Sequence, residues 1–499
     1  MKFNYYITSF VWSTICKLLN AGIGFISVPL LIKYFGIDQY GLLNMAVACN
    51  AYMQLMDLGM NTGAIKFFSE LKEKKDFAKY QRIVHSNFIF YLFLGIINAC
   101  IFLIMAVWCD IFFNIDATQV VILRRLLFIL SVMTIFSWIN TVFNQVLISY
   151  EKIGFTQQIN SVIIILKLFL IICTLNLSLS IYAYYFGQTF LIVMTLFPLG
   201  YKCLKNKYID NLKLKFYWTD FKPVLMYSIG IFVLSLLQMS ATQSRPIILS
   251  MFADRATTQM AYYKILETMP IFIISIGTTL SNIILPRAAA AITNNKKMEI
   301  YKISIQGTTV STILASLITI PVILNAEELL TLYMGRNYMF LAPLLQVWCF
   351  TVLLQIHSSP NYSILVSSGK LRNLVGITAF SCLLSIGINI YLCQIIGIAS
   401  VVICYLMYVT INMIYNYAYF YASVINIKKT EILFSFFRPM SISVITGMLV
   451  YSVEASFNSS FPPYIIIIVR SLVWILLFLL CLNVFKIISI KRLFSNYVR

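Results

Sequence analysis

The sequence contains few charged residues and few residues suited to metal binding. Only 11% of its 499 residues are charged, whereas a soluble domain has about 25%. There are two histidines, His85 and His357, and the eleven cysteines include no Cys-x-x-Cys pair. These absences exclude the usual zinc and disulfide-framework spacings. We therefore expect no metal or other cofactor, and we interpret the cysteines as small buried hydrophobic residues.

Sequence signatures of enzymes are also missing. A phosphate-binding Gly-x-x-x-x-Gly-Lys motif ending at Gly369-Lys370 would need a glycine at the position of Ile364. No pair of carboxylates has a catalytic spacing, and no segment between the apolar runs could hold a polymerase or ligase domain. The sequence therefore predicts a protein that is not an enzyme.

Long apolar runs recur from one end of the chain to the other. Hydrophobic residues make up 60% of the sequence, and the mean hydropathy is +0.87. A helix of about 20 apolar residues crosses a bilayer. We predict an all-α integral membrane protein with fourteen transmembrane helices. Their approximate spans are 8–33, 40–64, 84–108, 119–149, 154–175, 179–202, 222–252, 257–287, 300–325, 337–367, 371–394, 397–425, 432–454 and 463–486.

The basic residues are concentrated in alternate loops. If the N-terminus is cytosolic, most of the 37 Lys and Arg residues fall in cytosolic segments, and only Lys33, Arg255 and Arg336 lie clearly in loops on the other side. Cytosolic loops are enriched in Lys and Arg, so the pattern predicts a multi-pass protein of the cell (inner) membrane with both termini cytosolic. It also accounts for the net charge of +20 without nucleic-acid binding.

The longest segment without an apolar run is 201–222, between the sixth and seventh predicted helices. We predict an N-lobe at residues 1–210 with helices 1–6, and a C-lobe at 211–425 with helices 7–12. Residues 426–499 hold helices 13 and 14 and a cytosolic C-terminus. Repeated halves are common in transporters, where the substrate site lies between the repeats.

Several predicted helices carry polar residues at spacings of three or four, which places them on one helix face. The first stripe contains Ser13, Lys17, Asn20, Gly24 and Ser27. The second contains Asn50, Gln54, Asp57 and Asn61. Lys17 and Asp57 lie at similar depth from the cytosolic side, so we predict that they form an ion pair or share a polar vestibule. The alternative is that Lys17 extends its ammonium back to the membrane surface.

Further stripes occur in the fourth, fifth, seventh and eighth predicted helices. They contain Ser137, Thr141, Asn144 and Gln145; Gln157, Asn160 and Lys167; Ser235, Gln238, Thr242 and Arg245; and Lys264, Thr268, Ser275, Thr278 and Asn282. Such residues also occur where helices simply pack together in membranes. That alternative explains the hydroxyl groups better than it explains the cations, because helix packing does not require an excess of positive charge.

The charged residues inside the first eight predicted helices are mainly cationic. We predict a central cationic cavity that binds the substrate through Lys17, Lys167, Arg245 and Lys264. The predicted cavity-lining or gating residues are Asp57, Glu267, Asn20, Asn50, Gln54 and Gln238. An interior of net positive charge suits an anionic substrate such as a phosphate.

Other features of the helices have more than one interpretation. Arg124 and Arg125 either extend the cationic patch outward or reach to the membrane interface, and we expect Arg470 to snorkel or to contact lipid. Proline bends or interrupts membrane helices. Pro360 follows His357 closely, so we expect the tenth predicted helix to be broken near its middle.

Short motifs in a fixed order resemble those of Wzx-type polysaccharide flippases. The stretch 34–41, YFGIDQYG, is similar to the signature that follows the first helix of that family, and 55–60, LMDLGM, resembles its DLG element. Later elements are similar at 333–338 (YMGRNY), 367–370 (SSGK), 389–392 (NIYL) and 396–400 (IGIAS). The resemblance covers nearly the whole chain.

This resemblance implies a member of the multidrug/oligosaccharidyl-lipid/polysaccharide exporter (MOP) superfamily. It implies two six-helix lobes in a V shape, like those of MATE transporters, plus two C-terminal helices. The implied activity is the flipping of undecaprenyl-pyrophosphate-linked oligosaccharide repeat units by alternating access, for O-antigen or capsule synthesis. Na⁺ or H⁺ coupling and association with polysaccharide polymerase machinery would fit that activity.

Two details of the resemblance bear on mechanism. Lys264 and Glu267 are similar in placement to an Arg–Glu pair of the related lipid II flippases, whereas the stretch 243–250, QSRPIILS, lacks an aspartate that many relatives carry there. This protein could therefore couple to its ion differently. The alternative function is a MATE-like drug/cation antiporter, which would be expected to have buried acids rather than buried cations.

Overall fold

The computed structural model describes residues 2–210, 215–293, 296–368, 372–421, 427–455, 462–485 and 487. Within these ranges the ordered elements are helices, and no strand occurs. Eleven helices of the described residues are long and apolar enough to cross a membrane. The chain is therefore an all-α multi-pass membrane protein, as predicted, whereas the total of fourteen spans stays a prediction.

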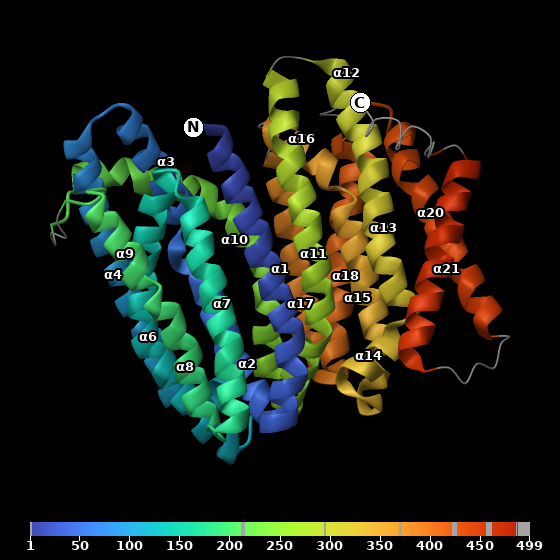
Figure 1. The fold of residues 1–499 in the computed structure, drawn as a ribbon, viewed down its shortest axis with the longest axis horizontal. Coiled ribbons are helices and arrows are strands. Elements are labelled where there is room, and N and C mark those ends of the chain that lie inside the picture. The colour runs from blue at the N-terminus through green and yellow to red at the C-terminus, as the bar shows by residue number, and fades with distance from the viewer. Residues whose placement is uncertain are drawn as a thin grey trace. The chain divides into compact units, whose positions relative to one another are not determined.

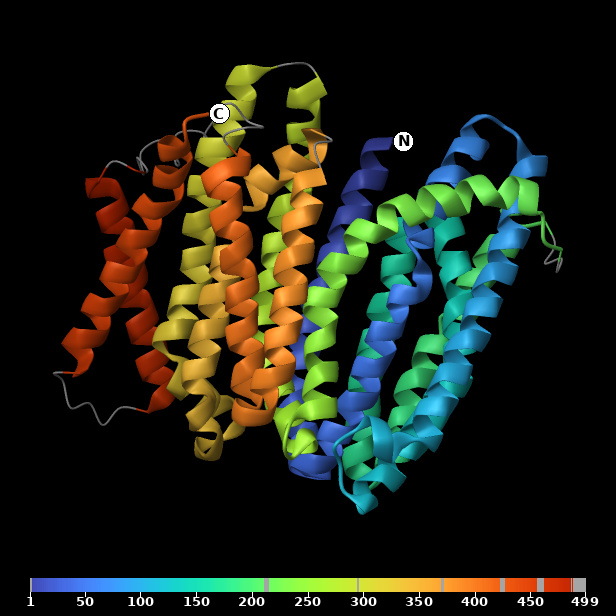
Figure 2. The same ribbon diagram turned by 180° about the vertical axis from the view of Figure 1, so that it is seen from behind.

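The chain divides into two compact units. The first contains Met1–Ile265 and Asn389–Ile398, and the second contains Leu266–Ile388 and Ala399–Arg499. The predicted lobe boundaries at residues 210 and 425 remain predictions. Figures 1 and 2 show the helices of each unit from two opposite sides.

The first unit contains α1 (Lys2–Phe35), α2 (Ile37–Met53), η1 (Gln54–Asp57), α3 (Met60–Glu73), α4 (Phe77–Val107), α5 (Cys109–Phe112), α6 (Ala117–Ser149), α7 (Ile153–Asn176), α8 (Ile181–Met194), α9 (Leu196–Lys205), α10 (Trp218–Phe252), the start of α11 (Ala256–Thr293) and the end of α17 (Arg372–Ile396). Helix α6 packs against α2, α3, α4, α8 and α9, and α1 runs beside α7 (Figure 1). A core of fully buried side chains joins α3, α4, α6 and α10, and it includes Phe68, Tyr80, Tyr91, Val142 and Phe221.

The predicted helix at 40–64 is interrupted. Helix α2 ends at Met53, η1 follows, and α3 begins at Met60. The break contains two residues with positive φ, Leu58 at 51° and Gly59 at 71°, a region that costs a bulky residue such as leucine free energy. A Cβ at Gly59 would lie 2.6 Å from the carbonyl oxygen of Ser228 on α10, and a Cβ at Gly63 would lie 1.9 Å from the Ser228 Oγ. The break therefore allows close contact with α10.

Helix α10 closes one end of the first unit. Figure 2 shows its first half crossing over the ends of α3 and α4 and its second half running beside α2. The Arg82 Nε on α4 lies 2.6 Å from the Asp220 Oδ2. Phe221, Val224 and Ser228 are fully buried against the unit. The first half of α10 is thus a packed part of this unit.

The stretch 34–41, which carries the family-like signature, forms a tight junction at the opposite end of the unit. Gly36, at φ 82°, separates α1 from α2. The Asp38 carboxylate accepts hydrogen bonds from the hydroxyls of Thr257 and Thr258, at 2.9 and 3.0 Å. A Cβ at Gly41 would lie 1.9 Å from the Thr257 carbonyl oxygen. These contacts attach the start of α2 to the start of α11.

The second unit continues with α12 (Lys297–Lys302), η2 (Ile303–Gly307), α13 (Thr308–Leu324), α14 (Ala326–Met334), η3 (Arg336–Leu341), α15 (Ala342–Ile356), α16 (Ser359–Ser368), α17 (Arg372–Ile396), α18 (Ile398–Tyr415), η4 (Asn416–Phe420), α20 (Lys429–Ala455) and α21 (Pro463–Val484). Helix α13 packs against α15 and α20. The predicted break in the tenth helix is confirmed, because α15 ends at Ile356 and α16 begins at Ser359. His357 is buried at this break and stacks on Phe436, with ring centroids 3.9 Å apart.

Arg470 does not snorkel, and this prediction was wrong. Its guanidinium on α21 donates two hydrogen bonds to the Glu328 carboxylate, at 3.0 and 3.1 Å, and one to the Leu324 carbonyl oxygen at 2.6 Å. The Arg470 side chain is only 9% exposed. The two groups of the pair compensate each other's charge at the end of α13 and the start of α14, so the arginine has a protein partner instead of a lipid one.

Candidate functional site

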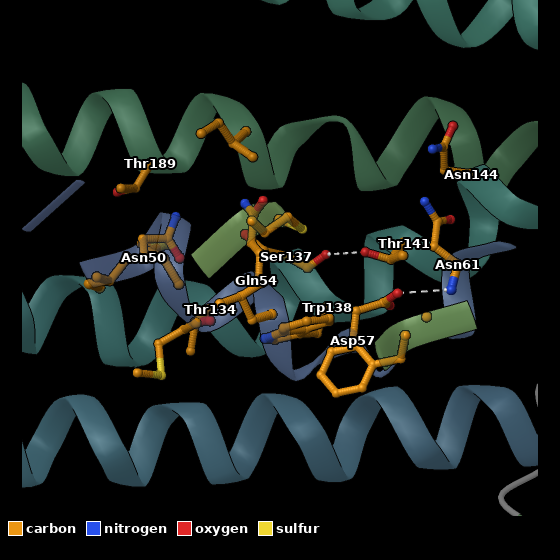
Figure 3. Close-up of a pocket in the computed structure, with 18 of the residues that line it drawn as sticks. Asn50, Gln54, Asp57, Asn61, Thr134, Ser137, Trp138, Thr141, Asn144 and Thr189 are labelled. Carbon is orange, nitrogen blue, oxygen red and sulfur yellow. Dashed lines mark hydrogen bonds between the residues drawn. The ribbon is translucent and has the colours of Figure 1, made fainter. Parts of the chain in front are cut away.

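The first unit contains a polar cavity of about 520 Å³. Figure 3 shows its polar side chains gathered from α2, η1, α3, α6 and α8. The nineteen lining residues are Asn50, Met53, Gln54, Leu55, Asp57, Gly59, Asn61, Thr62, Leu130, Met133, Thr134, Ser137, Trp138, Thr141, Asn144, Thr189, Ile192, Phe232 and Met239. Its volume lies in the range of about 300–1,000 Å³ that is usual for organic ligands.

Two of the predicted polar stripes meet in this cavity. The stripe of the second predicted helix contributes Asn50, Gln54, Asp57 and Asn61, and that of the fourth contributes Ser137, Thr141 and Asn144. Asn61 lines the cavity although it lies after the break, at the start of α3. The sequence therefore predicted polar residues of two cavity walls. The wall on α6 is one continuous helix, as expected, whereas the other wall is divided among α2, η1 and α3.

The sequence did not predict the apolar lining residues, nor four others: Thr62, Thr134, Trp138 and Thr189. Thr134 precedes Ser137 by three residues, so the same helical spacing would have extended the stripe to it. Thr189 is on α8, whose sequence has no polar stripe to reveal it. Trp138 packs on Tyr91, with ring centroids 5.6 Å apart and planes at 25°, a contact that depends on the tertiary structure.

Asp57 is held by a chain of hydrogen bonds behind the cavity wall. Its carboxylate accepts one hydrogen bond from the Tyr91 hydroxyl and one from the Asn61 backbone N–H, the latter at 2.9 Å. The Tyr91 hydroxyl in turn accepts from the Gln145 Nε2 at 2.6 Å, and the Asn87 Nδ2 donates to the Gln145 Oε1 at 2.7 Å. Asn87 and Gln145 are fully buried. The chain of bonds links the helix break to α4 and α6.

The predicted ion pair between Lys17 and Asp57 is wrong: among the described residues, Lys17 forms no salt bridge. Lys17 lies on α1, which packs mainly against α7, and its side chain is exposed. Asp57 instead turns toward α4, because η1 and the following turn direct its carboxylate to Tyr91. The acid that the sequence assigned to a gate thus has one partner on α4, Tyr91, and one at the start of α3, the Asn61 backbone N–H.

The four predicted substrate-binding cations do not line this cavity. Lys17 is exposed on α1, Lys167 is half-buried on α7, and Lys264 is half-buried on α11. Arg245 is buried on α10, with 6% of its surface exposed. The cavity therefore contains three predicted residues, Asn50, Gln54 and Asp57, without the cations. A common cationic site for the other four stays a prediction.

The remaining predicted lining residues lie outside the cavity or outside the described side chains. Asn20 is exposed on α1, and Glu267 is half-buried on the part of α11 that belongs to the second unit. The side chain of Gln238 lies outside the described residues, as do those of Ser235, Thr278 and Asn282.

Arg124 and Arg125 have local structural partners. The Arg124 Nε donates to the Ala106 carbonyl oxygen at 3.0 Å, near the end of α4. The Arg125 guanidinium lies 5.2 Å from the centre of the Tyr182 ring. Helix ends leave carbonyl groups without intrahelical partners, and a cation is favourable there. These arginines stabilise the junction of α4, α6 and α8.

Most of the polar groups on the cavity wall are available to a ligand. The side-chain amides of Asn50, Gln54, Asn61 and Asn144 form no hydrogen bond within the part of the chain that the structure describes. Among the described residues that line the cavity, Asp57 alone is charged. The cavity is therefore rich in groups that both donate and accept hydrogen bonds, and it carries at most one negative charge.

The fold is similar to those of several solved membrane transporters. The inward-closed lipid II flippase MurJ matches with a TM-score of 0.73 at 12% identity, over 98% of this chain and 100% of that one. An inward-facing MATE multidrug resistance transporter of the MOP superfamily matches with a TM-score of 0.67 at 12% identity, over 90% and 100%. A MOP superfamily transporter from Pyrococcus furiosus matches with a TM-score of 0.52 at 12% identity, over 88% and 95%. At these identities the similarity establishes the fold.

Family membership follows from the sequence itself. The family described as polysaccharide biosynthesis protein matches residues 7–281, more than half of the chain. The chain therefore belongs to the polysaccharide biosynthesis protein family, and its fold is similar to those of the flippase MurJ and the MATE transporter. Among curated protein sequences there is no significant match.

Proposed function

We propose that this protein flips undecaprenyl-pyrophosphate-linked oligosaccharide repeat units across the cytoplasmic membrane by alternating access. The observation that carries the proposal is a polar cavity inside an apolar, membrane-spanning unit of a polysaccharide biosynthesis family member. Polar groups are costly within a bilayer and usually mark a substrate path there. The product would serve a surface polysaccharide such as O-antigen or capsule.

The proposed orientation has both termini in the cytosol, at the inner membrane. In this orientation the basic loops face the anionic cytosolic leaflet. Lys17, Lys167, Arg245 and Lys264 would attract the pyrophosphate, and a Na⁺ or H⁺ gradient or the membrane potential would drive the cycle. Polysaccharide polymerase machinery on the outer face would take over the flipped lipid.

Deletion of the gene followed by lipid extraction tests this function. Undecaprenyl-linked repeat units should accumulate in the cytosolic leaflet, where an added membrane-impermeant glycosidase cannot reach them in intact spheroplasts. Re-expression should return them to the outer leaflet. Unchanged lipid intermediates in the deletion strain would contradict the proposal.

The second candidate is a MATE-like drug/cation antiporter. The Asp57 carboxylate in the cavity is the observation that favours it, because a buried acid suits a cationic drug. This function predicts altered tolerance to cationic drugs in the deletion strain, with lipid intermediates unchanged. The two functions therefore give opposite results in the same strain.

A further inference from the structure

We propose that the cavity of the first unit is a glycan subsite: it binds uncharged sugar rings of the lipid-linked substrate and does not bind its pyrophosphate. This inference rests on the proposed function and adds to it a division of the substrate between two places. The cavity would hold the part of the head group that differs between polysaccharides, whereas the cationic residues, which lie elsewhere, would hold the part that all such substrates share.

The first reason is the chemistry of the wall. Among the described residues that line the cavity, four have amide side chains and five have hydroxyl side chains. Each amide and each hydroxyl can donate and accept hydrogen bonds, and a sugar presents hydroxyls that do the same. Many such partners at varied angles suit a ligand with hydroxyls in several directions, such as an oligosaccharide.

The second reason is that these amides lack protein partners in the described structure. Gln54 and Asn61 are exposed, and Asn50 and Asn144 are half-buried. These amides are therefore open to water or to a ligand, and a ligand with its own hydroxyls can replace that water. By contrast, Asn87 and Gln145 behind the wall bond to each other. Asn50, Asn61 and Asn144 therefore differ from the structural amides of the same unit, because their hydrogen-bonding groups face the cavity (Figure 3).

The third reason is charge. A pyrophosphate binds through Arg, Lys or helix N-termini, and the described lining residues include no Lys, Arg or His. The N-terminus of α3 does reach the wall, but the Asp57 carboxylate already accepts its Asn61 N–H. The one charged group, Asp57, would repel a phosphate. Its carboxylate is already hydrogen-bonded to Tyr91 and to the Asn61 N–H.

A metal ion fits the cavity poorly. Among the described residues no group of three His, Cys, Asp or Glu side chains comes together, and one carboxylate is too few for a dedicated hard-cation site.

The cavity also has apolar surface from Trp138 and Met133. Trp138 is held in place by stacking on Tyr91, and a fixed aromatic side chain can cover the apolar face of a sugar ring.

The experiment compares two lipids on the purified full-length protein by native mass spectrometry. One is undecaprenyl pyrophosphate, and the other is the undecaprenyl-pyrophosphate-linked oligosaccharide extracted from the deletion strain. We expect the wild type to bind the glycosylated lipid at least tenfold more tightly. Asn61→Leu and Asn144→Leu, tested separately, should each reduce that preference about three- to tenfold, the effect of one hydrogen bond, and leave binding of the bare lipid unchanged.

Asn160→Leu is the matched control, because Asn160 is an exposed asparagine on α7 that does not line the cavity. It should keep the full preference. Gln54→Leu provides a third cavity variant if one of the two asparagine variants does not fold. The inference is overturned if the cavity variants keep the wild-type preference, or if they weaken both lipids equally, since the cavity would then hold the pyrophosphate.

The same measurement separates this inference from the proposed function. If the purified wild type binds both lipids equally, while the deletion strain accumulates repeat units in the cytosolic leaflet, the glycan subsite is overturned and the flippase function stands. If the purified wild type binds neither lipid, and the deletion strain has unchanged intermediates, both proposals are overturned.

Discussion

The Tyr91 hydroxyl on α4 donates a hydrogen bond to the Asp57 carboxylate at the break between α2 and α3. Tyr91 is fully buried, and its ring also packs against Trp138 on α6. One residue thus connects three helices and the wall of the cavity. It holds the carboxylate in place at a point where the backbone has left its helical path.

Tyr91→Phe should destabilise the protein by about 1–3 kcal/mol, because the Gln145 amide and the Asp57 carboxylate each lose a buried partner. The melting temperature of the detergent-purified protein measures the effect. Tyr201→Phe is the control, since Tyr201 is 63% exposed. An unchanged melting temperature for Tyr91→Phe would show that the hydrogen-bond chain does not hold the break.

Gly41→Ala should prevent correct assembly of the first unit, because a Cβ at this position would lie 1.9 Å from the Thr257 carbonyl oxygen. We expect little monodisperse protein in size-exclusion chromatography. Gly22→Ala is the matched control: a Cβ there meets nothing within 4 Å. Equal yields of the two variants would contradict the close contact between α2 and the start of α11.

Glu328→Gln should lower the free energy of unfolding by up to about 3–5 kcal/mol, since it leaves the Arg470 guanidinium with little compensation for its charge. The melting temperature of the detergent-purified variant again measures the effect. Replacing both members, with Glu328→Gln and Arg470→Met, should recover part of the loss, because the uncompensated charge is then removed.

The control for this pair is the exposed ion pair of Glu70 and Lys74, at 2.6 Å. The hydrogen bond from Lys74 lowers the pKa of the Glu70 carboxyl, yet solvent screens such a pair strongly. Glu70→Gln should leave the melting temperature unchanged. If Glu70→Gln lowers the melting temperature as much as Glu328→Gln does, burial does not explain the contribution of the Arg470–Glu328 pair to stability.

Arg245→Ala and Lys264→Ala should each impair flipping at normal expression, if these cations attract the pyrophosphate. The readout is the amount of surface polysaccharide made by complemented deletion cells, together with the leaflet distribution of the lipid intermediate. Arg336→Ala, in the predicted outer loop, is the charge-matched control. Full flipping activity in both Arg245→Ala and Lys264→Ala would refute a pyrophosphate site formed by these cations.

The predicted topology places the C-terminus in the cytosol. A C-terminal green fluorescent protein should fluoresce, and a C-terminal alkaline phosphatase should be inactive. The reverse result would require either an odd number of spans or both termini on the outer side. It would also contradict the assignment of the basic loops to the cytosol.

Periodicity accounts for what could be predicted of the site. Asn50, Gln54, Asp57 and Asn61 recur every three to four residues, and so do Ser137, Thr141 and Asn144, which predicts one helix face for each set. The second set lies on α6, whereas the first reaches the same cavity from α2, η1 and α3. The neighbours of those faces could not be predicted in the same way. Asp57 bonds to Tyr91 and not to Lys17, because that choice depends on how α2, α4 and α1 pack.

The sequence by itself determined that this is an all-α multi-pass membrane protein whose apolar helices carry polar stripes. The length of an apolar run and the three-to-four-residue spacing of polar residues are local properties of the sequence. The tertiary structure decided the break at Leu58-Gly59, the pairing of Arg470 with Glu328, and the separation of the cavity from the four cations. Each of these depends on contacts between residues far apart in the chain, such as Gly59 with Ser228, and such contacts leave no local pattern in the sequence.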